Sequence, residues 1–109
     1  MKLLLDTHTF IWWAAESSRL SARALKTLQS PDYDVLLSVV SIWEIQIKLQ
    51  LGKMSLPLPM PLREIVENQQ RINDVQLLHV SAEHVYALNE LPPHHKDPFD
   101  RLLLAQARK

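Results

Sequence analysis

The chain has 109 residues, of which 47% are hydrophobic, and this length and composition suit one domain with a single core. Twelve basic and twelve acidic residues cancel, so a polyanion such as nucleic acid would have to bind a local basic patch rather than the overall charge. The absence of cysteine excludes disulfides and thiolate zinc sites, and the single glycine excludes glycine-rich phosphate loops and dinucleotide fingerprints.

Short apolar runs that alternate with amphipathic patterns predict an α/β protein. Ser21, Ser81 and Asp97 are residue types that cap helix N-termini, and Gly52 suits a left-handed position at a helix C-terminus. In chain order we expect a strand over residues 3–5, helices over 10–15 and 21–31, a strand over 35–37, a helix from Ser38 or Ser41 to Gly52, a helix over 62–72, a strand over 75–80, a helix over 81–91 and a last helix from Asp97 onwards.

This alternation predicts a central parallel sheet with helices on both faces. The chain stops at Lys109 inside the last predicted helix, where a parallel α/β unit normally continues into another strand. We therefore expect a single domain over residues 1–109 that is shortened at its C-terminus. Residues 3–5 would then form an exposed, apolar edge of the sheet.

Acidic residues stand where the apolar elements begin or end. Asp6 follows the first strand, Glu44 lies in the most apolar helix, and Asp97 and Asp100 lie in the first turn of the last helix. Carboxylates brought together from separate elements repel each other unless a cation neutralises them. Oxygen ligands of this kind select Mg²⁺ or Mn²⁺, and such an ion beside a phosphate implies hydrolysis by a metal-activated water.

Each acid also has a purely structural explanation, which the sequence leaves open. Asp6 could cap the helix that follows it, and the acids of the last helix suit the positive end of a helix dipole. Glu44 stands three residues after Ser41, the spacing of a capping box, and four residues before Lys48, the spacing of a helical ion pair.

Three segments resemble the leading motifs of PIN-domain proteins, and in particular VapC-type toxins of bacterial toxin–antitoxin pairs. They are LLDTH at residues 4–8, SVVSIWEI at residues 38–45 and HHKDPFDRLLLAQA at residues 94–107. The resemblance implies a three-layer PIN-like fold and an endoribonuclease that depends on Mg²⁺ or Mn²⁺. It also implies an RNA substrate and a cognate antitoxin whose C-terminal segment lies across the site.

By the same resemblance, Asp6, Glu44 and Asp100 match the catalytic acids of the family. Asp97 would join Asp6 and Asp100 as an auxiliary metal ligand. Thr7 would orient Asp6 or a metal-bound water.

Two cations near the acids could contact RNA phosphates. Lys96 precedes the acidic helix and Arg101 lies in its first turns, and both are candidates for substrate binding. The alternative is that they belong to a solvated surface. PIN domains continue into a further strand that ends in a Thr/Ser-x-Asp segment and adds a fourth acid, which this chain does not supply.

Two other functions fit part of this pattern. A haloacid-dehalogenase-like phosphatase also begins with a strand that ends in Asp, but it needs a second Asp where His8 stands. A catalytically impaired PIN-like module that binds an antitoxin or its own copy is the remaining alternative.

Compartment and assembly follow from weaker signals. No apolar run resembles a signal sequence or reaches the roughly 18 residues of a membrane span, so we expect a soluble, cytoplasmic protein. Phe10 and the tryptophans at positions 12, 13 and 43 are expected in the core or in the interface of a homodimer.

Overall fold

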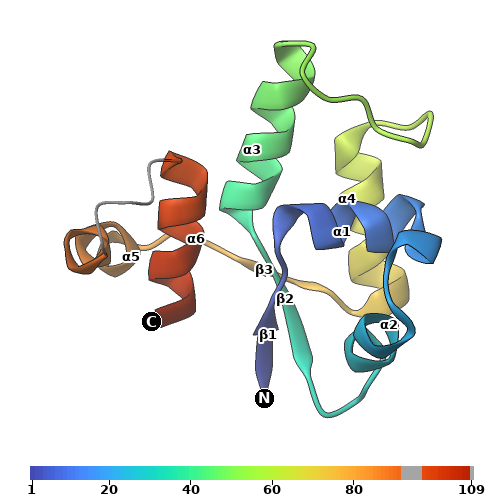
Figure 1. Cartoon of the computed structure of the whole chain (residues 1–109), viewed down its shortest axis with the longest axis horizontal. Helices are drawn as coiled ribbons and strands as arrows, with labels where there is room; N and C mark the ends of the chain where they lie inside the picture. Colours follow the sequence, from blue (N-terminus) through green and yellow to red (C-terminus); the bar gives the residue numbers. More distant parts are fainter. Residues whose placement is uncertain (92–96, 109) are drawn as a thin grey trace.

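The computed structural model describes residues 1–91 and 97–108 and shows an α/β fold (Figure 1). The elements in chain order are β1 (Lys2–Leu4), α1 (Thr7–Ala15), η1 (Ser17–Arg19), α2 (Ala22–Leu28), β2 (Asp34–Ser38), α3 (Val39–Gln50), α4 (Leu62–Asn73), β3 (Gln76–Leu78), α5 (Ala82–Tyr86), η2 (Ala87–Glu90) and α6 (Pro98–Arg108). None of these helices is long and apolar enough to cross a membrane.

The three strands form one parallel sheet in the order β1-β2-β3. Leu3 pairs with Val35, and Leu37 pairs with Leu77. Figure 1 shows α1, α2 and α4 on one side of the sheet and α5 and α6 on the other. The predicted parallel sheet with helices on both faces is therefore confirmed.

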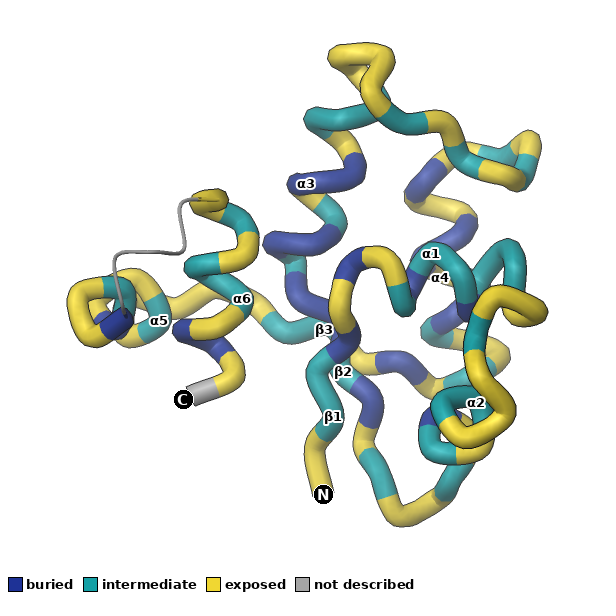
Figure 2. The backbone as a smooth tube through the Cα atoms, in the orientation of Figure 1, coloured by how far each residue is buried: buried dark blue, intermediate teal, exposed yellow. Residues whose placement is uncertain are grey.

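The hydrophobic residues form a large core and a small one. The large core lies where the sheet meets α1 to α4, and its most deeply buried members include Phe10, Leu37 and Ile45. Figure 2 shows this burial along α3 and on one side of α4. Ala87, Leu91 and Ala105 form the small core between η2 and α6. The helix that carries Asp100 is thus packed in part on a separate cluster.

A buried pair of side chains attaches α6 to the end of β2. Ser38 caps α3, because its hydroxyl oxygen accepts a hydrogen bond from the amide of Val40. The same hydroxyl donates to Oε1 of Gln106, and both side chains are almost fully buried. Of the two predicted starts of this helix, Ser38 and Ser41, the structure therefore shows Ser38 as the N-cap.

Local signals located several helix ends correctly. Ser21 and Ser81 accept capping hydrogen bonds from the backbone, and Gly52 adopts a left-handed conformation with φ of +69° after α3. The expected single helix over 81–91 is wrong, because its second half tightens into the 3₁₀ helix η2. Tight turns of this kind are common at helix ends.

The first helix begins at Thr7, three residues earlier than its apolar pattern indicates. Thr7 and Thr9 interrupt that pattern, but Thr7 is buried with an exposed fraction of 2%. The expectation that an edge strand forms near residues 3–5 is confirmed, since β1 pairs with β2 alone among the described strands. Within β1, Leu3 and Leu4 are half-buried, and Leu5, just after the strand, is only 3% exposed.

The large core predicts the effect of truncating a central leucine. Leu37→Ala should lower the free energy of unfolding by about 3 kcal/mol, because Leu37 is fully buried and its removal leaves a cavity. Leu51→Ala is the matched control, since Leu51 is 62% exposed and its loss should cost less than about 0.5 kcal/mol. Urea denaturation monitored by circular dichroism measures both values, and equal losses would contradict this description of the core.

Candidate active site

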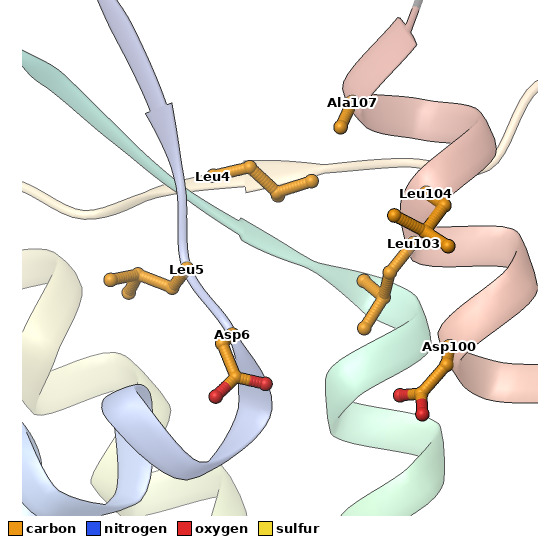
Figure 3. Close-up of a pocket in the computed structure, with 7 residues that line it drawn as sticks. All are labelled: Leu4, Leu5, Asp6, Asp100, Leu103, Leu104 and Ala107. Carbon is orange, nitrogen blue, oxygen red and sulfur yellow. The ribbon is translucent and has the colours of Figure 1, made fainter.

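Asp6 and Asp100 open onto one pocket although they are far apart in the sequence. Asp6 is the N-cap residue of α1, just beyond the end of β1, and Asp100 lies in the first turn of α6. Both line a pocket of about 370 Å³. Figure 3 shows their carboxylates at one end of this pocket, with leucines and Ala107 along the rest.

The backbone accounts for the position of Asp6. The Leu5 amide donates to the carbonyl of Leu36 at 2.8 Å, which extends the sheet pairing to the residue before Asp6. Asp6 then has an extended conformation, and its side chain makes no capping hydrogen bond with α1. The structural explanation of Asp6 as a side-chain helix cap is therefore wrong, and its carboxylate faces the pocket.

Glu44 is held by a buried hydrogen-bond network on the neighbouring helix. The Thr7 hydroxyl donates to Glu44 Oε1 at 2.9 Å and shares a second hydrogen bond of 2.9 Å with the Ser41 hydroxyl. Lys48 Nζ donates to Glu44 Oε2 at 2.6 Å. Both oxygens of this carboxylate thus have a partner, and only 5% of the Glu44 side chain is exposed.

This network decides between the structural explanations of Glu44. The ion pair with Lys48 is confirmed. The capping box with Ser41 is wrong, because Ser38 caps the helix and Ser41 contacts Thr7. The Thr7 hydroxyl bonds to Glu44 rather than to Asp6, and its other expected function, the orientation of a metal-bound water, stays a prediction.

The acids influence one another electrostatically. Burial raises the pKa of Asp100 above its ordinary value, and the charges of Asp97, Glu44 and Asp6 raise it further, while Lys48 acts in the opposite direction. The hydrogen bond to Glu44 raises the pKa of Lys48 against the effect of burial, and Asp97 and Asp100 add to this rise. A positive charge beside these acids is therefore favourable.

Asp97 caps α6, as its residue type predicts. Its Oδ1 accepts hydrogen bonds from the amides of Phe99 at 2.8 Å and Asp100 at 3.3 Å. These bonds set the first turn of α6 and thereby the direction of Asp100. The capping function accounts for Asp97 whether or not it also contacts a metal.

Lys96 and Arg101 are predicted to bind substrate, and only Arg101 lies in the described part of the chain. Lys96 lies outside the described residues. Arg101 is partly buried, and its Nη2 donates to the carbonyl of Leu88 at 3.0 Å. Arg101 therefore also links α6 to η2.

An aromatic pair that sequence reasoning did not identify lies next to the acids. Trp43 on α3 packs edge-on against Phe99 on α6, with ring centroids 4.9 Å apart and an interplanar angle of 79°. Trp13 is buried in the core, whereas Trp43 is 54% exposed and lies outside it, so for Trp43 only the other expected place, the interface of a homodimer, stays a prediction. The pair joins the residues that precede Glu44 and Asp100, but two distant positions give no signal of such contact in one sequence.

The arrangement offers hard oxygen ligands without forming a complete metal centre. Across residues 1–91 and 97–108, no group of three or more acidic or histidine side chains is placed to hold one ion. The convergence of Asp6, Glu44 and Asp100 on one ion stays a prediction: Glu44 is hydrogen-bonded to Thr7 and Lys48 and is not among the residues that line the pocket of the other two acids. Asp6 and Asp100 still fit a divalent cation, since both face one pocket and their charges disfavour each other there.

Comparison with known proteins adds independent evidence to this geometry. The model of the PIN domain family matches residues 3–109. The chain belongs to the PIN-domain family. It is 29% identical over 105 residues to Ribonuclease VapC22 of Mycobacterium tuberculosis (strain ATCC 25618 / H37Rv), an alignment that covers 96% of this chain and 78% of the relative. No solved structure shows a significant match to the chain.

Family membership confirms the resemblance seen in the three motifs and the PIN-like α/β fold. The structure shows where the acids of those motifs lie. The acids of the first and third motifs face the same pocket, and the acid of the second motif lies next to them in the Thr7 network.

The network around Glu44 predicts the effect of removing its hydroxyl partner. Thr7→Val should lower the free energy of unfolding by about 1–3 kcal/mol, because the buried Ser41 and Glu44 oxygens each lose a hydrogen bond. Thr7→Ser keeps the hydroxyl and should retain most of this stability. Chemical denaturation of the two variants measures the difference, and a Thr7→Val protein as stable as Thr7→Ser would show that the network does not stabilise the fold.

The raised pKa of Asp100 predicts a pH-dependent gain in stability when its charge is removed. In chelator at neutral pH, Asp100→Asn should unfold at higher urea than the wild type, because the folded protein disfavours the ionised carboxylate. As the pH falls, the folded wild type gains its proton first, so the difference narrows. The difference in stability disappears below pH 3.8, the ordinary pKa of this carboxyl group, where Asp100 is protonated in both the folded and the unfolded protein.

Urea denaturation at a series of pH values tests this expectation. Asp34→Asn, at an exposed aspartate on β2, is the matched control and should show no comparable change. Equal stabilities of Asp100→Asn and the wild type at neutral pH would mean that neither burial nor the neighbouring acids disfavour the ionised carboxylate of Asp100.

Proposed function

We propose that this chain is a divalent-metal-dependent endoribonuclease, the toxin of a VapC-type toxin–antitoxin pair. The observation that carries this proposal is the shared pocket of Asp6 and Asp100 in a PIN domain. The name of the similar mycobacterial protein, a ribonuclease, supports RNA as the substrate. A cognate antitoxin, a homodimer and a cytoplasmic location remain parts of the same proposal.

Asp6 and Asp100 would hold the metal ion, with Asp97 as an auxiliary ligand through the oxygen that does not cap α6. When bound, a Mg²⁺ or Mn²⁺ ion lowers the pKa of a water molecule and offsets the charge of the scissile phosphate. Glu44, fixed by Thr7, would act as the third acid beside this pocket. Lys96 and Arg101 would contact the RNA backbone.

The pocket also suits the position of a cleavable phosphate. It lies beyond the carboxyl end of β1, where α/β proteins bind their ligands. The leucines and Ala107 along its wall are apolar, so the carboxylates of Asp6 and Asp100 are the charged groups among its lining residues. The acids and the apolar wall thus form an asymmetric site that is charged at one end.

A second candidate function is binding without cleavage, with an antitoxin or a second copy of the chain as the partner. The observation that favours it is the engagement of both Glu44 oxygens by Thr7 and Lys48, which leaves two acids facing the pocket. Cleavage assays separate the two functions.

The nuclease proposal predicts the effect of neutralising Asp6. In the presence of Mn²⁺ or Mg²⁺, wild-type protein should cleave single-stranded RNA, and Asp6→Asn should reduce the rate at least about 100-fold, because the variant keeps the shape of the side chain but loses a charged ligand. Chelator should abolish the wild-type activity. Gel analysis of labelled RNA measures the rates.

Asp34→Asn again serves as the control and should cleave at the wild-type rate. An Asp6→Asn protein that cleaves as fast as the wild type would remove Asp6 from the mechanism. A folded wild-type protein that cleaves no RNA with either ion would favour the binding function instead.

A further inference from the structure

The acidic site already contains a cation supplied by the chain itself. Lys48 is four residues after Glu44 on α3, so the two side chains lie on the same face of the helix. The Lys48 ammonium is 2.6 Å from Glu44 Oε2, and the lysine side chain is 31% exposed. Lys48 therefore reaches from the surface to a buried carboxylate.

This ammonium places a positive charge beside the acids, as a bound metal ion would. It interacts favourably with Asp97 and Asp100 as well as with Glu44. Thr7 occupies the other oxygen of Glu44, so no Glu44 oxygen is without a protein partner. A metal ion bound to Glu44 would lie beside the Lys48 ammonium, so the two cations would repel each other and compete for the same carboxylate.

We propose that Lys48 is an internal counter-ion that competes with the divalent cation for Glu44 and thereby weakens metal binding at the acidic site. This inference rests on the proposed metal-dependent function. Without metal, Lys48 neutralises a carboxylate whose burial is otherwise costly. With metal bound, its like charge repels the ion.

The chemistry of lysine suits such an exchange. Its ammonium sits on a flexible stem of four carbons and is strongly hydrated when it turns toward solvent. The partial exposure of Lys48 gives it a path to solvent that the buried Glu44 lacks. The ion pair can therefore open without displacement of α3, and the freed carboxylate remains in place through Thr7.

The affinity of the protein for Mn²⁺, measured by calorimetry without RNA, tests the proposal. Lys48→Met should bind Mn²⁺ about tenfold more tightly than the wild type, because a nearby positive charge is lost and a Glu44 oxygen becomes available. Lys53→Met is the matched control: it removes the charge of an exposed lysine beyond the end of α3 and should leave the affinity within about twofold. Lys48→Arg retains the charge and should show no gain.

A double-mutant cycle connects the gain to Glu44. In the wild-type background, Glu44→Gln should change the Mn²⁺ affinity little, because Lys48 and Thr7 already occupy the carboxylate. In the Lys48→Met background, the same substitution should remove the gain. A gain that survives Glu44→Gln would overturn the competition for Glu44.

The thermal midpoint gives a second measurement that does not depend on activity. In chelator, Lys48→Met should melt below the wild type, because Glu44 loses its counter-ion, and Mn²⁺ should raise its midpoint more than that of the wild type. If Lys48→Met is unfolded in chelator, Mn²⁺ should restore its fold. An affinity equal to or weaker than that of the wild type, or a failure to fold in Mn²⁺ by both Lys48→Met and Lys48→Gln, would overturn the proposal.

RNA cleavage by the wild type distinguishes failure of this inference from failure of the proposed function. Wild-type cleavage in Mn²⁺ together with an unchanged affinity of Lys48→Met would overturn the role of Lys48 alone. An inactive wild type together with a Glu44-dependent gain in affinity would contradict the nuclease function and support the role of Lys48.

Discussion

The charge of Glu44, buried between α1 and α3, is the constraint on which the site depends. A carboxylate with 5% of its surface exposed is tolerated only with partners at both oxygens, and Thr7 and Lys48 provide them. Because Thr7 is the first residue of α1, the same hydrogen bond fixes the start of this helix. The preceding residue, Asp6, is thereby held at the mouth of the pocket.

The fold was predictable where its signals are local. Ser21, Ser81 and Asp97 cap helices as their residue types predict, and Gly52 follows α3 in the left-handed conformation. The start of α1 was not predictable from apolar periodicity, because the buried face at Thr7 is polar. Its partners Ser41 and Glu44 are 34 and 37 residues away in the chain, so no local pattern reveals why a hydroxyl is buried there.

The candidate site was predictable in its residues and less so in its geometry. The motifs identified Asp6, Glu44 and Asp100, and the spacing of Glu44 and Lys48 predicted their ion pair. The sequence could not show that Thr7 would bind the second oxygen of Glu44, or that Glu44 would be absent from the lining of the shared pocket. Both depend on how α1 and α3 pack against each other, and no local pattern encodes this packing.

The acids of the site come from parts of the fold that pack on two different cores. Asp6 and Glu44 follow the adjacent strands β1 and β2 and rest on the large core, so their separation is set with that core. Asp100 belongs to α6, which packs partly on the small cluster around Ala105. The buried hydrogen bond from Ser38 to Gln106 also joins α6 to the end of β2, so Asp100 is positioned from the sheet as well. A substitution at Gln106 would therefore change the position of Asp100 relative to Asp6 without touching either acid.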